Sequence, residues 1–251
     1  MTPKTKYIAA AVGLALLASA AYAATNRVSI SDSGNQRCIT SNGIPNHTTG
    51  QFPNKGNPHT MKSQNVSFCV TKSPTKGNTA QQVAVPGIAL NGVIMRPGTA
   101  DWYDASSPRG HSRDRSSGWN LDGMGARDML GLDDQNAHVG RNGEYHYHGV
   151  PKSIASITNG TLMGYAADGF EIHYVGSSAK ASYMLLPGSR SSSPGGAHDG
   201  TYNEDWQYVQ GSGNLDKCNG GIVDGKYVYF ATDTYPFYPR CLYGTDVTRF
   251  R

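Results

Sequence analysis

Short runs of β-forming residues, separated by glycine-containing turns, are the feature that most restricts the fold of this chain. The chain has 31 glycines and 15 tyrosines among 251 residues. The clearest runs are Gln82 to Val85, Ile88 to Met95, Phe170 to Val175 and Tyr227 to Thr232. Turn signals lie around and within them at Asn42-Gly43, Asn91-Gly92, Arg96-Pro97-Gly98, Asn142-Gly143, Asn159-Gly160, Asp168-Gly169, Pro187-Gly188, Asp199-Gly200 and Asp224-Gly225. This pattern predicts an all-β fold, mainly antiparallel and sandwich- or barrel-like, with long loops and at most one or two short helices.

Two longer segments complete the expected organisation. The best helix candidate is Leu121 to Leu130, although its two glycines weaken it as a helix former. Ser177 to Gly200 is rich in serine and glycine and is predicted to form a long surface loop. No linker divides the chain, so residues 24–251 are predicted to form a single domain.

The first 23 residues have the pattern of a secretory signal peptide. Lys4 and Lys6 precede the apolar run from Ile8 to Ala18, and Ala21-Tyr22-Ala23 offers a small-residue cleavage site. We expect cleavage after Ala23 and a periplasmic or secreted product; an uncleaved membrane anchor is the alternative. No later stretch approaches the roughly 20 apolar residues of a membrane-spanning helix.

Charge argues against a nucleic-acid partner. The chain has 22 basic and 18 acidic residues, and removal of Lys4 and Lys6 with the signal leaves a formal charge of +2. Phosphate binding requires a dense basic patch, which such a small excess does not provide.

Four cysteines lie in the exported part, at Cys38, Cys69, Cys218 and Cys241. An even number in an oxidising compartment predicts two disulfides, for which three pairings are formally possible. The sequential pairing, Cys38–Cys69 and Cys218–Cys241, closes two moderate loops and is preferred. Metal-binding thiolates are the alternative, but the chain has no CxxC pair.

The stretch from Gly143 to Gly149, GEYHYHG, alternates two tyrosines with two histidines. In a strand, His146 and His148 share one face, because residues i and i+2 point the same way. The segment from Gly225 to Phe230 repeats the same frame with Val228 and Phe230 at the histidine positions. The strand can therefore be built without histidines, which favours a functional role for them.

His138 joins this face only if the intervening turn has the right length. A two-residue turn at Asn142-Gly143 places His138 on the opposite face, whereas a three-residue turn from Arg141 to Gly143 pairs it with His146. The longer turn needs a left-handed residue at its last position, where Gly143 stands. We therefore expect His138, His146 and His148 to lie together.

Three facing imidazoles suit Cu or Zn²⁺ and leave a fourth position open. Glu144, Asp133 and Asp134 are candidates for orienting the rings or adding a carboxylate ligand. For a metal-dependent hydrolase, Glu144 or Asp168 would be the general base. The alternative is an aromatic strand whose histidines only form local hydrogen bonds. Asp199, Glu204 and Asp205 lack the ligand spacing of an EF-hand, so a Ca²⁺ site is not predicted.

The segment NAHVGRNGEYHYHGVP, residues 136–151, resembles the signature of the YHYH-domain family of exported proteins. Other segments on both sides of it are also similar to the family. One lies upstream, SNGIPNHTTGQFPNKGNP, and four lie downstream in this order: GYAADGF, DGTYNEDWQYV, LDKCNGG and YVYFATDTYPFYPRC. The resemblance covers about Cys38 to Tyr243. It implies an exported protein in which Tyr145, His146, Tyr147 and His148 are the name-giving residues, but it implies no particular reaction. The chain departs from the family pattern at Glu171-Ile172-His173 and at Val228.

These observations predict an exported protein that binds copper or zinc through His138, His146 and His148, for redox, metal-handling or hydrolytic work. The alternative is a non-catalytic surface module whose tyrosine-rich strands recognise a glycan, another small molecule or an exported protein.

Overall fold

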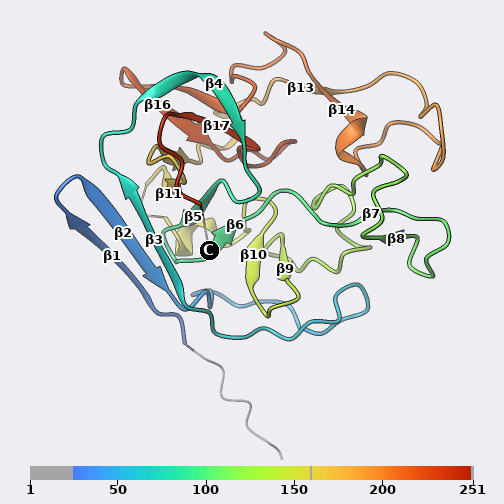
Figure 1. The fold of residues 1–251 in the computed structure, drawn as a ribbon, viewed down its shortest axis with the longest axis horizontal. Helices are drawn as coiled ribbons and strands as arrows, with labels where there is room; N and C mark the ends of the chain where they lie inside the picture. The colour runs from blue at the N-terminus through green and yellow to red at the C-terminus, as the bar shows by residue number, and fades with distance from the viewer. Residues whose placement is uncertain (1–24, 159, 250–251) are drawn as a thin grey trace, which may run out of the picture.

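The computed structural model describes residues 25–158 and 160–249 (Figure 1). The expected signal peptide and its cleavage site lie outside these ranges. Within them, no helix is long and apolar enough to cross a membrane.

Strands dominate the described residues, and the helices are three single turns of 3₁₀ type. The strands are β1 (Val28–Ser33), β2 (Gln36–Ser41), β3 (Val66–Thr71), β4 (Lys76–Gln82), β5 (Gly87–Ala89), β6 (Ile94–Met95), β7 (Trp102–Tyr103), β8 (His111–Ser112), β9 (Ala137–Val139), β10 (Tyr145–Tyr147), β11 (Leu162–Ala166), β12 (Glu171–His173), β13 (Tyr183–Leu185), β14 (Trp206–Tyr208), β15 (Gly220–Val223), β16 (Lys226–Phe230) and β17 (Cys241–Gly244). The helical turns are η1 (Ile154–Ser156), η2 (Gly176–Ser178) and η3 (Asn203–Asp205).

The largest sheet has eight strands in the order β15-β16-β12-β11-β5-β6-β10-β9. Its neighbours are antiparallel except for β12 with β16 and β6 with β10, which are parallel. β1, β2 and β3 form a second, three-stranded sheet, and the remaining strands pair as β13-β14, β17-β4 and β7-β8. In Figure 1, the β9–β10 hairpin lies between the β1–β3 ribbon on one side and the β7–β8 hairpin on the other. The predicted all-β, mainly antiparallel class is confirmed.

The main core lies between the large sheet and the segments packed on it. Short central strands are buried along their length, so their side chains are apolar on both faces. Burying such a side chain contributes about 1.5–3 kcal/mol each. Tyr145, Tyr147 and Tyr229 are wholly buried in this core. These tyrosines are therefore structural and do not form an exposed aromatic surface.

Both predicted disulfides are present. Cys38 and Cys69 face each other across β2 and β3, and Cys218 is joined to Cys241 at the start of β17. On the chain-entropy model, closing loops of 31 and 23 residues stabilises the fold by roughly 3–4 kcal/mol each.

Two of the expected segments, the helix candidate and the long loop, differ in the structure. Leu121 to Leu130 forms a series of turns rather than a helix, because Gly123 and Gly125 are pressed against other segments: a Cβ on Gly125 would lie 1.8 Å from the Gly200 carbonyl. The predicted turn at Asn91-Gly92 is present, and it divides the run from Ile88 to Met95 into β5 and β6. The expected loop from Ser177 to Gly200 contains the short strand β13.

Candidate metal centre

The β9–β10 hairpin places two of the three predicted histidines side by side. His138 on β9 is in register with His146 on β10. The backbone N–H of Gly140 donates to the Glu144 carbonyl at 2.8 Å, so the connecting loop is the three residues 141–143. Gly143 has a φ of +83°, the left-handed conformation that this turn requires. The predicted turn length and its consequence for His138 are both confirmed.

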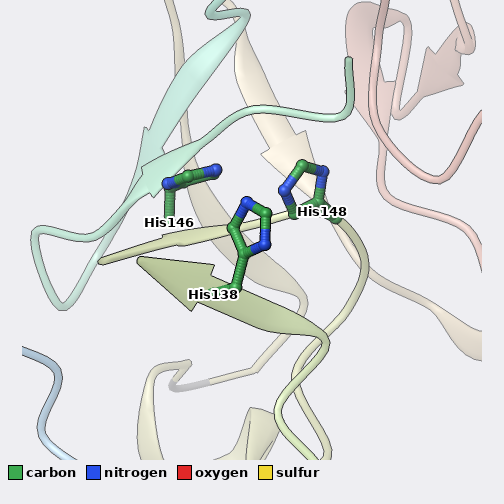
Figure 2. A group of neighbouring side chains, drawn as sticks. All are labelled: His138, His146 and His148. Atoms are coloured by element: carbon green, nitrogen blue, oxygen red, sulfur yellow. The ribbon is translucent and has the colours of Figure 1, made fainter. Parts of the chain in front are cut away.

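The three imidazoles form a nearly equilateral group. Ring centroids lie 4.8 Å apart for His138 and His146, 4.7 Å for His138 and His148, and 4.8 Å for His146 and His148. One nitrogen of each ring faces the space between the side chains (Figure 2), and the three candidate ligand atoms lie within 4.8 Å of one another.

Backbone carbonyls fix which nitrogen faces inward. The Nδ1 atoms contact the carbonyls of Leu130 at 2.8 Å for His138, of Glu144 at 3.1 Å for His146 and of Pro97 at 3.4 Å for His148. A carbonyl can only accept, so each Nδ1 carries the proton and donates it. Each Nε2 is then an unprotonated acceptor, which is the form that binds metals.

Two of the three rings are almost completely shielded from water, and one of them has an unpaired nitrogen. His146 and His148 are 3% and 1% exposed, and His138 is half-buried. The Nε2 atom of His148 is buried and has no hydrogen-bond partner. A histidine that served only to fill the core would be expected to have both nitrogens paired. The unpaired, inward-facing Nε2 therefore points to a ligand.

Burial also keeps these rings neutral. Desolvation lowers the pKa of His146 and of His148 well below the usual value, and the neighbouring histidines reinforce the effect. Burial likewise lowers the pKa of His138, although its bond to Leu130 and the nearby Asp101 carboxylate oppose this. Neutral imidazoles can bind a metal without first losing a proton.

These lowered pKa values predict how the metal-free protein responds to acid. Below about pH 6.5 the histidines of the unfolded chain take up protons that the folded protein excludes, so the free energy of unfolding falls as pH decreases. Urea titrations between pH 7.5 and 5.5 should show this loss in the metal-free wild type and a smaller loss in His146→Gln/His148→Gln. An equal loss in both proteins would contradict the assignment.

The geometry fits a transition metal. A zinc–nitrogen distance of about 2.0–2.1 Å with tetrahedral angles places the ring centroids about 5 Å apart, close to the observed triangle. Three protein nitrogens leave one tetrahedral position open to another ligand.

Of the four carboxylates considered from the sequence, Glu144 lies at the cluster. Its Oε1 atom is 3.9 Å from His146 Nδ1 and 2.8 Å from Arg96 Nη2. Asp133 instead accepts hydrogen bonds from the Tyr145 hydroxyl at 2.8 Å and the Gly50 N–H at 2.9 Å. Asp134 is exposed and pairs with Lys152. The hypothesis that Asp133 and Asp134 orient the imidazoles was wrong.

The fourth carboxylate, Asp168, lies in the turn between β11 and β12. In the sheet, β5 and β6 lie between β11 and β10. The strand that leads into Asp168 is therefore three strand spacings, or roughly 14 Å, from the strand that carries His146. The Oδ2 atom of Asp168 accepts from the Tyr229 hydroxyl at 2.7 Å and the Gly244 N–H at 2.9 Å. Burial raises the pKa of Asp168. The structure does not bring Asp168 to the histidines.

The repeated strand β16 supports the comparison with β10. The hydroxyl of Tyr227, which occupies the position of Tyr145 in the frame, donates to Asp216 at 2.7 Å as that of Tyr145 does to Asp133, so the first tyrosine of the frame has the same role in both strands. Val228 and Phe230 form a small apolar cluster with Ala179 and Leu215. The histidine positions of the frame can thus be filled by apolar packing.

His148 is also surrounded by residues that could not be identified from the sequence. Gly123 lies against the ring, since a Cβ there would be 2.1 Å from Nδ1. The Pro97 carbonyl, which accepts from His148, lies 3.4 Å from Arg240 Nη2. Arg240 also pairs with the buried Asp122. These groups come from distant segments, and no local pattern marks them.

A second imidazole–carboxylate pair lies near His138. The His111 ring is buried and its Nδ1 atom is 3.2 Å from Asp101 Oδ1. The other histidines do not join the cluster; His173, for example, pairs with Glu171 at 2.7 Å on β12.

Comparison with known families places these residues in context. A family model described as "YHYH protein" matches residues 67–244, a range that includes the three clustered histidines, Glu144 and Arg96. No curated protein and no solved structure matches the chain.

Proposed function

Since this chain belongs to the YHYH protein family, we propose that it is an exported protein that binds one copper or zinc ion through His138, His146 and His148. The Nε2 atoms of the three rings are the ligands. The fourth position takes an exogenous ligand.

One observation carries this proposal. Each of the three rings directs its Nδ1 atom at a backbone carbonyl and its Nε2 atom at the other two rings. Orienting three imidazoles in this way takes three different segments, at Leu130, Glu144 and Pro97. Such outer hydrogen bonds are characteristic of metal-binding histidines, because they fix the tautomer and the ring angle.

The donor set supports copper or zinc over other ions. Imidazole nitrogens suit these metals, whereas Ca²⁺ and Mg²⁺ prefer oxygen ligands. Glu144, near His146, is the carboxylate that we propose as a proton acceptor if the bound metal performs hydrolysis. Asp168 is too far from the cluster for that role.

Export fits two intramolecular disulfides, which persist in oxidising compartments. We propose that the signal peptide is cut after Ala23 and that residues 24–251 form the mature domain. N-terminal sequencing of the exported protein should begin at Ala24.

Elemental analysis tests the metal assignment. The protein is purified without a histidine tag, stripped, incubated with Zn²⁺ or Cu²⁺ and desalted. We expect about one equivalent in the wild type and less than about 0.2 in His138→Gln/His146→Gln/His148→Gln. Equal metal in both proteins, or none in the wild type, would refute the proposal. Circular dichroism shows whether the triple variant is folded.

A further inference from the structure

Arg96 lies directly beside the histidine cluster. It follows β6, which runs parallel to β10, and its N–H donates to the Tyr147 carbonyl at 2.8 Å. His146 pairs with Ile94 and Tyr147 with Met95, so the next residue, Arg96, lies opposite His148. Paired residues of neighbouring parallel strands point to the same face of the sheet. The Arg96 side chain then reaches Glu144, next to His146. Arg96 thus runs along the edge of the cluster from one histidine to the other.

A positive charge at this place needs a reason, because it disfavours a bound cation. The charge of Arg96 contributes to lowering the pKa of all three histidines, so it acts on the whole cluster. Glu144 lies close to this charge, but Glu144 Oε1 accepts no aligned hydrogen bond from the guanidinium.

The guanidinium of Arg96 also has unused donors. Across residues 25–158 and 160–249, Glu144 is the one side chain that pairs with Arg96. The Nε atom of Arg96 is buried and has no hydrogen-bond partner. By contrast, Arg190 donates to Asp199, Asp205 and the Gly195 carbonyl. The Arg96 side chain is 37% exposed, so a ligand from solvent can reach it.

We propose that Arg96 makes the open position of the three-histidine centre a site for an oxyanion, a carboxylate or phosphate group of the ligand. The inference rests on the proposed metal binding. The metal and the guanidinium would share the anion, as arginine forks do with planar or tetrahedral oxyanions. Arg240, behind His148, adds positive charge, while Glu144 and Asp101 are the carboxylates that oppose it.

Cobalt(II) provides a spectroscopic probe of this position. The Co(II)-loaded protein is titrated with acetate, inorganic phosphate and imidazole while the visible absorption bands are recorded. Acetate and phosphate are expected to bind the wild type and to bind Arg96→Gln at least about tenfold more weakly. Imidazole is neutral, so its affinity should change by less than about twofold. As a control, Arg37→Gln removes an arginine of β2 that pairs with Asp32 of β1, and it should match the wild type throughout.

A double variant separates the loss of Arg96 from the exposure of the Glu144 charge. Arg96→Gln/Glu144→Gln removes both members of the pair, so the net charge is unchanged. Weak oxyanion binding in this variant supports the proposal, because only the guanidinium donors then account for it. Wild-type oxyanion affinity in either Arg96 variant, or no spectral response of the wild type to acetate and phosphate, would overturn it. If Co(II) itself does not bind, the proposed metal centre fails instead.

Discussion

Replacing His148 by glutamine is expected to lower zinc affinity by about 100- to 1,000-fold. A structural zinc site contributes about 10–16 kcal/mol, so one of four ligands accounts for about 2.5–4 kcal/mol. His148 is the most deeply buried of the three rings, and its Nε2 atom has no other partner. Competition with a chromophoric zinc chelator measures the change.

Two further variants make this test specific. His173→Gln removes another buried strand histidine, four strands from β10, and should bind zinc like the wild type. Gly123→Ala keeps all three ligands but places a Cβ against His148 Nδ1. We expect it to lose about 10- to 100-fold in affinity, as when an outer hydrogen bond of a ligand is disturbed. Zinc affinity within threefold of the wild type in His148→Gln would contradict the assignment of this ligand, given that threefold is only about 0.7 kcal/mol.

Replacing Arg240 by methionine is expected to destabilise the fold by about 3–5 kcal/mol, because it leaves a buried carboxylate unpaired. Asp122 is 1% exposed, and its other oxygen accepts from the N–H groups of Met124 and Gly125. Arg240 also donates to Asn203 at 2.6 Å and stacks on Tyr235. The pair therefore joins three segments around the loop that packs on His148.

The double variant Asp122→Asn/Arg240→Met should recover much of this loss, since it removes both charges. Urea denaturation at pH 7 measures each free energy of unfolding. A cost below about 1 kcal/mol for Arg240→Met alone would show that the pair behaves like a surface ion pair.

Local rules of sequence were sufficient for the part of the site carried by one hairpin. The alternation of His146 and His148 with tyrosines fixed their common face, and the glycine at position 143 decided which turn joins them to His138. The disulfides could be predicted because the sequential pairing closes the shorter loops. In each of these cases the deciding residues lie within about 30 positions of one another.

The rest of the site depends on contacts that no local pattern encodes. His148 Nδ1 donates to a carbonyl 51 positions away, and Arg240 pairs with an aspartate 118 positions away. Arg96 reaches the cluster because β6 pairs in parallel with β10, a pairing of distant segments that no local pattern indicates. Leu121 to Leu130 was expected to be a helix, but close packing of Gly123 on His148 takes precedence over helical spacing. Asp168 was a candidate on residue type alone, and its distance follows from strand order.

The most direct test of the metal centre is anomalous scattering from crystals of the zinc- or copper-loaded protein, recorded on both sides of the metal absorption edge. We predict a single anomalous peak about 2.0–2.1 Å from the Nε2 atoms of His138, His146 and His148, with a fourth ligand that the protein does not supply. A peak bound through other residues, or no peak among the three rings in metal-loaded crystals, would contradict the account.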